Sequence, residues 1–253
     1  MDLQLNGKVA LVTGGSGGLG RAICLGLAAE GANAAVHYRR DAELADAVVA
    51  ELQQLHGVEA MSVHGDVSRE DDVLEMFRRV EDRFSRLDIL VNNAGVWPTA
   101  SVLEMTVADW EQTFAVNLKG PFLCCREATR RWLASQRGGR IVNISSQAAF
   151  QGATTGHAHY AASKAGLVNF TVSLAREMAP HGIHANAVAA GMMRTDMTRE
   201  TLQVNEDKYL DRIPLRRIGD PAEVADIVVF LASARASYMT GATVDVTGGM
   251  LMR

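Results

Sequence analysis

The chain has 253 residues, of which 48% are hydrophobic and 21% charged, and its formal net charge is −4. This is the composition of a folded globular protein, and the weak negative charge with scattered basic residues argues against a nucleic-acid-binding surface. The sequence has no apolar run long enough to cross a membrane and no signal-peptide pattern, so we expect a cytoplasmic protein.

Short apolar runs alternate with stretches of helical periodicity along the whole chain. The runs expected to form strands are residues 8–13, 34–38, 60–63, 88–91, 140–144, 184–188 and 244–246. The stretches expected to form helices are residues 19–30, 41–56, 70–84, 107–135, 160–179 and 221–231. This alternation predicts an α/β fold, a Rossmann-type doubly wound parallel sheet flanked by helices on both faces. No repeat or linker interrupts it, so we predict a single domain over residues 1–253.

A glycine-rich turn follows the first predicted strand. Residues 13–20 read T-G-G-S-G-G-L-G and lead directly into the first predicted helix. Glycines permit a tight turn and let the backbone approach a pyrophosphate, which the positive end of the following helix attracts. The turn therefore predicts a dinucleotide-binding site, with an ordinary glycine-rich turn as the alternative.

The end of the second predicted strand indicates which dinucleotide is bound. An NAD enzyme usually carries an acidic residue there for the ribose 2′-hydroxyl, whereas this chain has Tyr38 followed by Arg39 and Arg40. Two guanidinium groups suit a 2′-phosphate, which favours NADP over NAD. The alternative is that an arginine pairs with Asp41 or Glu43 on the surface.

Tyr160 and Lys164 are four residues apart on a predicted helix, so both side chains lie on one face. A fixed ammonium group beside a phenol favours the phenolate and brings the tyrosine pKa toward neutrality, where general acid–base catalysis is efficient. The same spacing also occurs by chance on solvated helix faces. The pair predicts proton transfer only in combination with the dinucleotide site.

Taken together, these motifs resemble the short-chain dehydrogenase/reductase family over essentially the whole length of the chain. The glycine turn matches the family pattern T-G-x-x-x-G-x-G, and residues 92–95 match its N-N-A-G. Asn117 lies where the family has its helix asparagine. Ser146 ends the fifth predicted strand, and the Y-x-x-x-K pair follows it.

The resemblance implies a role for each catalytic residue. Tyr160 is expected to exchange a proton with the substrate oxygen, and Ser146 to hydrogen-bond the same atom. Lys164 is expected to lower the Tyr160 pKa and bind the nicotinamide ribose. Asn117 is expected to hold a proton relay, with a helix-packing amide as its alternative role.

The resemblance also implies a set of residues that bind the cofactor, NADP, with NAD as the alternative. The set is Gly14, Ser16, Gly17, Gly18, Leu19, Gly20, Tyr38, Arg39, Arg40, Asp66, Val67, Asn93, Ala94, Gly95, Tyr160, Lys164, Gly191, Met193 and Thr195. Two positions depart from the family pattern. Ala190 replaces the proline of P-G-x-x-x-T, and Gly17 replaces a basic residue that NADP-using relatives often carry.

The substrate side of the site is less clearly marked in the sequence. Ser146, Tyr160 and Trp97 are expected to contact the substrate, and residues 195–212, which lack a strong pattern, to form a mobile lid. His157 and His159 have no third ligand nearby, so we interpret them as lining the entrance or solvated. The three cysteines lack a metal or disulfide spacing, so no bound metal and reduced thiols are expected.

The ending of the chain resembles that of the 3-oxoacyl-[acyl-carrier-protein] reductases of fatty acid biosynthesis. Arg137 stands where these enzymes carry a basic residue for the acidic carrier protein, but His181 and Glu104 replace two others. We therefore expect NAD(P)H-dependent interconversion of a carbonyl and a secondary alcohol on a small-molecule or carrier-bound substrate. Oxidation of a sugar or other secondary alcohol, or reduction of a free ketone, is the alternative.

A protein of this fold that has lost catalysis and senses the cofactor is a more remote alternative, since Asn117, Ser146, Tyr160 and Lys164 are all present. The helices that carry Asn117 and Tyr160 are apolar on more than one face and need a second surface to bury. A homotetramer is therefore expected. The residues that indicate it are Leu118, Phe122, Leu167, Phe170 and Leu174.

Overall fold

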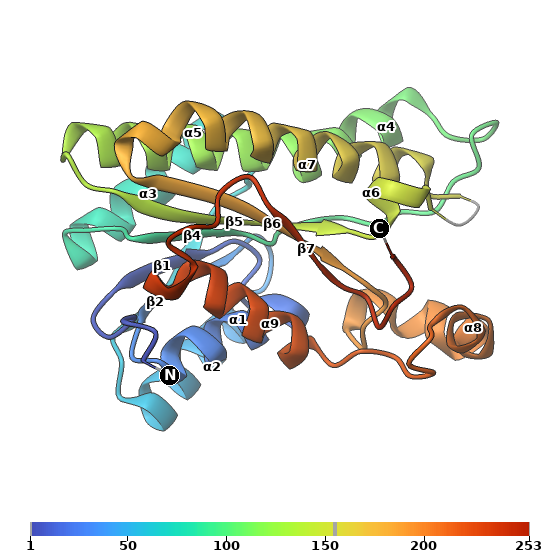
Figure 1. Cartoon of the computed structure of the whole chain (residues 1–253), viewed down its shortest axis with the longest axis horizontal. Helices are drawn as coiled ribbons and strands as arrows, with labels where there is room; N and C mark the ends of the chain where they lie inside the picture. The colour runs from blue at the N-terminus through green and yellow to red at the C-terminus, as the bar shows by residue number, and fades with distance from the viewer. Residues whose placement is uncertain (1, 154–155, 253) are drawn as a thin grey trace.

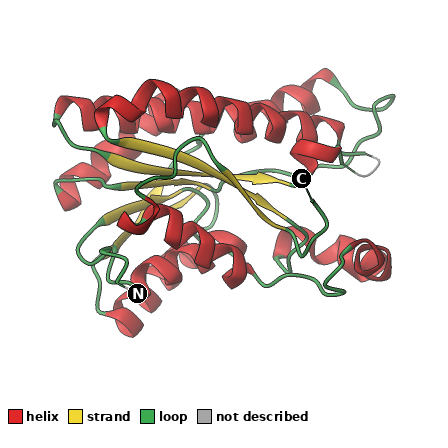
Figure 2. Ribbon diagram, viewed as in Figure 1, coloured by secondary structure: helices red, strands yellow, loops and turns green. Residues whose placement is uncertain are grey.

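The computed structural model describes residues 2–153 and 156–252 and contains one seven-stranded parallel sheet. Figures 1 and 2 show this sheet between two layers of helices. The strand order is β3-β2-β1-β4-β5-β6-β7. The strands are β1 (Val9–Val12), β2 (Asn33–Tyr38), β3 (Ala60–His64), β4 (Ile89–Asn92), β5 (Gly139–Ser146), β6 (Ile183–Ala190) and β7 (Thr243–Val246). The predicted fold class is confirmed.

The helices pack on both faces of the sheet. They are α1 (Gly18–Ala29), α2 (Ala42–His56), α3 (Glu70–Phe84), α4 (Val107–Phe114), α5 (Gly120–Ala134), α6 (Ala148–Gln151), α7 (Ala158–Met178), α8 (Arg199–Arg212) and α9 (Pro221–Ala232). In Figure 1, α1, α2 and α9 lie below the sheet, and α3, α4, α5 and α7 lie above it. Two buried apolar clusters, one on each face, join these layers to the strands.

The central strands are buried on both faces, as a parallel sheet covered by helices requires, whereas the edge strands β3 and β7 are only partly buried. All four residues of β1 are buried, and β6 is buried at every position except His184. Runs such as V-A-L-V therefore form strands without polar alternation. Their side chains meet helices whichever way they point.

Two differences from the sequence-based expectation concern helices. Residues 199–212 form α8, although no helical pattern was predicted there. This helix is charged, buries only Leu202 and Tyr209, and has non-helical backbone angles at Asn205. Its apolar stripe is too short to give a periodic signal. The predicted helix over residues 107–135 is divided by a π-helical segment, η1 (Ala115–Lys119).

The strand order places the site. The chain runs from β1 outward to β3, then returns to the other side of β1 through β4. In such sheets, ligands bind where this reversal leaves a crevice at the carboxyl ends of the strands. The glycine turn after β1, the N-N-A-G segment after β4 and Ser146 at the end of β5 all meet at that edge. Among the described residues, no helix is long and apolar enough to span a bilayer.

Candidate active site

A cavity of about 400 Å³ opens at the carboxyl edge of the sheet. Of the residues predicted from the sequence, those that line it are Gly14, Gly17, Gly18, Leu19, Gly20, Asn93, Ala94, Gly95, Trp97, Ser146, Tyr160, Lys164, Gly191, Met193 and Thr195. The predicted residues that do not line it are Ser16, Tyr38, Arg39, Arg40, Asp66, Val67 and Asn117. The structure thus joins the glycine turn to the Ser146, Tyr160 and Lys164 side chains in one cavity.

The glycine turn presents free backbone donors to this cavity. Helix α1 begins at Gly18, and Gly17 at its N-cap has no side chain to accept from the first-turn amides. The first turn also contains no acidic residue. Its unpaired N–H groups and the positive end of the helix therefore fit the pyrophosphate of a nicotinamide dinucleotide.

Two side chains hold the glycine turn against the strands. The Asn93 amide donates to the carbonyl oxygens of Thr13 and Gly14, at 3.0 and 3.1 Å. From the other side, His37 Nδ1 accepts from the Gly14 amide at 2.9 Å, and its Nε2 donates to the Gly65 carbonyl, also at 2.9 Å. We refer to the His37 and Asn93 side chains, which hold the turn from two sides, as its clamp.

His37 was not singled out from the sequence. Burial lowers its pKa to about 4, so the ring is neutral, and its two hydrogen bonds fix the tautomer that carries the proton on Nε2. A single histidine in an apolar strand gives no sign of this role, because its partners come from the turn after β1 and the loop after β3.

At the end of β2, Arg39 contacts Asp66 across a gap of 3.6 Å from Nη1 to Oδ2. Asp41 instead caps helix α2, accepting from the Leu44 amide. Arg40 is exposed and has no ion pair with any residue that the structure describes. The alternative, in which one arginine pairs with Asp41 or Glu43 on the surface, is therefore not seen among the described residues.

The Asp66 carboxyl group stays ionised beside Arg39. Burial raises its pKa, but the hydrogen bonds from Ser68 and the charge of Arg39 together lower the pKa by more. The net shift of the pKa is therefore downward. An ionised acceptor and two arginines lie at the end of the sheet where the adenosine of a dinucleotide is expected.

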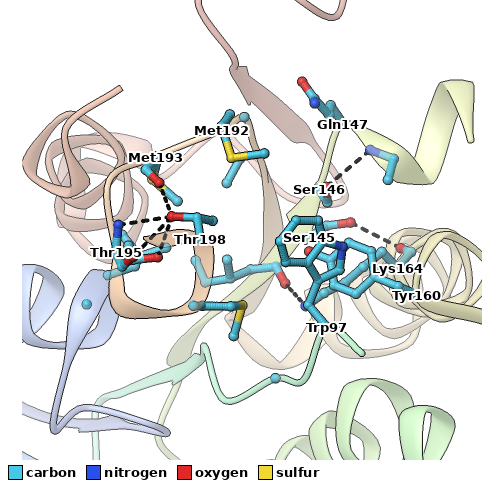
Figure 3. Close-up of a pocket in the computed structure, with 18 of the residues that line it drawn as sticks. Trp97, Ser145, Ser146, Gln147, Tyr160, Lys164, Met192, Met193, Thr195 and Thr198 are labelled. Atoms are coloured by element: carbon cyan, nitrogen blue, oxygen red, sulfur yellow. Dashed lines mark hydrogen bonds between the residues drawn. The ribbon is translucent and has the colours of Figure 1, made fainter. Parts of the chain in front are cut away.

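Ser146 and Lys164 are brought together by β5 and α7 (Figure 3). Ser146 is 8% exposed and its Oγ accepts from the Ala148 amide at 3.2 Å. Lys164 is 4% exposed and donates from Nζ to the Ile144 carbonyl at 2.7 Å. Its Nζ is 5.8 Å from the centre of the Tyr160 ring.

The pKa of Tyr160 shifts in the opposite direction to the one expected from the sequence. Burial raises it, and a hydrogen bond with Ser146 lowers it by less. Burial also lowers the pKa of Lys164 to about 8. The physical reason is that both groups are desolvated together, and the nearest bond of the lysine is with a backbone carbonyl.

Asn117 is fully buried within η1. Its amide donates to the Val96 carbonyl and to Ser163 Oγ, and its Oδ1 accepts from the Val96 amide at 2.8 Å. The side chain thus ties the cavity wall to α7. π-Helical turns inside α-helices occur frequently at functional sites.

Trp97 covers one side of the catalytic cluster. Its ring stacks on His157 with centroids 4.4 Å apart and meets the Tyr160 ring edge-on at 6.4 Å. His157 is buried and hydrogen-bonds the Pro98 carbonyl, and burial lowers its pKa. His159 is fully buried and lies outside the cavity. The expectation that both histidines line the entrance or are solvated is therefore wrong.

The wall opposite Tyr160 is formed by the segment after β6. The Gly191 amide donates to Val246, and a Cβ atom at Gly191 would lie 2.8 Å from the Thr247 backbone. This close approach requires glycine even though Ala190, rather than proline, precedes it. Thr198 Oγ1 donates to the Met193 carbonyl and so fixes the turn at Thr195.

Several lining residues were not predicted, and they belong to the substrate side. They are Gln147, Gln151, Met192, Met197, Tyr209, Arg212 and Met250. Met197, Tyr209 and Arg212 lie within residues 195–212, the segment expected to form a lid, whereas no motif marks Gln147, Gln151, Met192 and Met250. Among residues 2–153 and 156–252, no three His, Cys, Asp or Glu side chains are close enough to hold a metal ion.

The residues expected to bind a carrier protein lie at the other edge of the sheet. Arg137 and His181 are exposed and precede the amino ends of β5 and β6. The eight residues of β5 separate that edge from Ser146 by about 25 Å. Of the residues expected at a subunit interface, Leu167 and Leu174 are buried within the chain itself, whereas Phe122 is exposed.

Comparison with known proteins places these features in context. A family model described as Enoyl-(Acyl carrier protein) reductase matches residues 14–251. The chain is 44% identical to a 3-oxoacyl-[acyl-carrier-protein] reductase of Synechocystis, over 98% of both chains, and 43% identical to one of Aquifex aeolicus, over 99% of this chain and 100% of that one.

Solved structures give the same picture. A short-chain type dehydrogenase/reductase from Mycobacterium marinum superposes with a TM-score of 0.94 at 32% identity, covering 100% of this chain and 98% of the other. A structure from Agrobacterium tumefaciens, described as a proposed gluconate dehydrogenase, also reaches 0.94, at 36% identity, and covers 100% and 99%.

Proposed function

The chain belongs to the short-chain dehydrogenase/reductase family of NAD(P)-dependent oxidoreductases, and we propose that it reduces 3-oxoacyl thioesters carried by acyl carrier protein, with NADPH as the reductant. The observation that carries this proposal is the single cavity in which free amides at the start of α1 adjoin Ser146, Tyr160 and Lys164. The names of the curated relatives supply the substrate class.

When bound, the nicotinamide supplies the hydride that adds to the carbonyl carbon of the substrate. The Tyr160 hydroxyl donates its proton to the carbonyl oxygen, and the Ser146 hydroxyl hydrogen-bonds the same oxygen. Because burial raises the Tyr160 pKa, the phenol stays protonated at neutral pH, as a general acid in the reductive direction must. Lys164 stabilises the phenolate that remains.

Asn117 acts in this scheme through position. Its side chain bonds to Val96 and Ser163 and so fixes η1 against α7 at the residue that precedes Lys164. We assign it to holding the proton path to Lys164 in place rather than to contact with the substrate. His37 and Asn93 likewise act through position, because they hold the backbone of the glycine turn in place.

Arg39 and Arg40 support NADPH over NADH. The 2′-phosphate requires cations at the end of β2, and Arg40 is the arginine there that has no internal counter-ion among the described residues. Replacement of Arg40 by alanine is expected to raise the KM for NADPH about tenfold and leave the KM for NADH unchanged. Equal effects on both cofactors would contradict the NADPH assignment.

The description of the matched family model names enoyl reduction. An experiment must therefore distinguish reduction of a carbonyl group from reduction of a carbon–carbon double bond. The Ser146 and Tyr160 hydroxyls hydrogen-bond each other in one cavity, and together they suit the two lone pairs of a carbonyl oxygen. We expect NADPH-dependent turnover of acetoacetyl-CoA and much slower turnover of crotonyl-CoA. Faster reduction of crotonyl-CoA would replace the proposal by enoyl reduction.

A sugar acid is the second candidate substrate. It is favoured by the likeness to the Agrobacterium structure and by Arg212, which lines the cavity and has no ion pair with any described residue. Oxidation of gluconate with NADP, measured beside acetoacetyl-CoA reduction, separates the two.

We also propose that the protein forms a homotetramer. This proposal is supported by the exposed side chains of Trp110 on α4 and Phe122 on α5, and sedimentation equilibrium tests it.

A further inference from the structure

Gln147 follows Ser146 and lines the same cavity (Figure 3). Its backbone amide donates to the Ala190 carbonyl at 3.1 Å, which anchors the residue at the junction of β5 and β6. Helix α6 begins at the next residue. The side chain therefore projects from a fixed backbone position at the end of β5, next in sequence to Ser146.

The Gln147 side-chain amide has no hydrogen-bond partner among the residues that the structure describes. Its Oε1 is buried without a hydrogen-bond partner, and its Nε2 donates to no described residue. The other side-chain amides that line the cavity behave differently: Asn93 donates to the Thr13 and Gly14 carbonyls, and Gln151 donates to the Met250 carbonyl at 3.4 Å. Unpaired amides beside a site require an explanation, and a ligand group is one.

The orientation of this amide defines the kind of group that it can bind. Because Oε1 is the buried end of the amide, the accessible end is the NH₂ group, a donor without an acceptor among the described residues. In Figure 3 the side chain extends from the Ser146 end of β5 away from Tyr160 and Lys164. Its partner is therefore an acceptor on a part of the substrate beyond the reacting carbonyl.

We propose that Gln147 is a specificity residue that donates a hydrogen bond to a second carbonyl oxygen of the substrate, two carbons from the carbonyl that is reduced. This deepens the proposed function and rests on it, because a 3-oxoacyl thioester carries such an oxygen at its thioester carbon. The reacting oxygen is held by Ser146 and Tyr160, and the thioester oxygen by Gln147. The enzyme accordingly selects 1,3-dicarbonyl compounds over simple ketones.

Two substrates of equal chain length test this inference. Ethyl acetoacetate and 2-heptanone have the same number of chain atoms, but only the first has a second carbonyl. For Gln147→Leu, we expect kcat/KM with NADPH to fall about tenfold for ethyl acetoacetate and less than twofold for 2-heptanone. Gln147→Glu, which keeps the shape but removes the donor, is expected to lose at least as much with ethyl acetoacetate.

Gln53→Leu is the matched control, because Gln53 on α2 is exposed, lies outside the cavity and donates its amide to the Ala60 carbonyl. It is expected to keep the wild-type ratio between the two substrates. Thermal unfolding is expected to show Gln147→Leu as stable as the wild type, since the replacement removes a buried oxygen without a partner.

The outcomes separate the inference from the proposed function. Wild-type enzyme that reduces neither ethyl acetoacetate nor acetoacetyl-CoA would overturn the proposed function. Active wild-type enzyme together with an unchanged Gln147→Leu variant would overturn only the role of Gln147. Equal losses on both substrates would also overturn it, because they would indicate a structural role without recognition of the second carbonyl.

Discussion

The glycine turn and the substrate wall lie at two ends of one cavity, yet they are built in opposite ways. At the glycine turn, His37 and Asn93 bond the backbone from two sides, and glycine packs against backbone. At the substrate wall, the side chains of Met192, Met197 and Met250 line the cavity beside the unbonded amide of Gln147. A site that binds one cofactor favours a rigid backbone turn, whereas a wall of methionine side chains adapts its shape to varied substrates.

Proton transfer lies at the boundary of the two regions and is expected to give the largest effect. Tyr160→Phe removes the general acid but keeps the ring that packs against Trp97. We expect kcat for acetoacetyl-CoA reduction to fall about 10³-fold, the middle of the range for a lost general acid. NADPH binding, measured by fluorescence titration, is expected to change less than twofold. A residual rate above one tenth would show that another group supplies the proton.

Rigidity of the glycine turn is tested by a matched pair of glycine variants. A Cβ atom at Gly20 would lie 2.0 Å from the Gly14 carbonyl oxygen, whereas one at Gly17 would have no atom within 4 Å. Gly20→Ala is expected to weaken NADPH binding about 100-fold, because backbone must move in the cradle. Gly17→Ala is expected to fold with wild-type stability, as urea unfolding would report. If Gly20→Ala and Gly17→Ala bound NADPH equally well, the glycine turn would not be more rigid than the substrate wall.

His37 makes the rigid region sensitive to acid. Its pKa is lowered to about 4 in the folded chain, against an ordinary value of 6.5. The unfolded chain therefore takes up a proton first, so this contribution to stability is present above pH 6.5 and is lost as the pH falls toward 4. Between pH 7 and pH 5 the free energy of unfolding is expected to fall by about 2 kcal/mol from this group.

His37→Asn is the variant that isolates this effect. Asparagine keeps one acceptor and one donor but does not titrate, so its unfolding free energy, from urea denaturation, is expected to change about 2 kcal/mol less over the same interval. An identical pH dependence in both proteins would assign the loss to other groups.

The smallest effect is expected at the substrate wall. Met192→Ala enlarges the cavity at a wall whose methionine side chains already adapt their shape to the ligand. The KM for acetoacetyl-CoA is therefore expected to rise less than threefold, with kcat unchanged. A loss of tenfold or more in initial-rate measurements would mean that the methionine wall is shaped as closely as the glycine turn.

The sequence by itself determined the parts of the protein whose chemistry is local. Apolar runs and helical periodicity predicted every strand and most helices, because a buried parallel sheet needs continuous apolar strands. The site was predicted from two local patterns, the glycines between a strand and a helix and the spacing of four residues from Tyr160 to Lys164. Their function depends on short spacings that the chain displays directly.

Only the tertiary structure decided what depends on contacts between distant segments. The clamp of His37 joins β2 to the turn after β1 and the loop after β3, and no spacing encodes it. The unpaired state of Gln147 becomes visible only when all its neighbours are placed. Helix α8 lacks a periodic stripe because it buries little. Likewise, the balance of burial and charge at Tyr160 depends on how deeply the fold places the phenol, so its pKa could not be predicted from its distance to Lys164 along the chain.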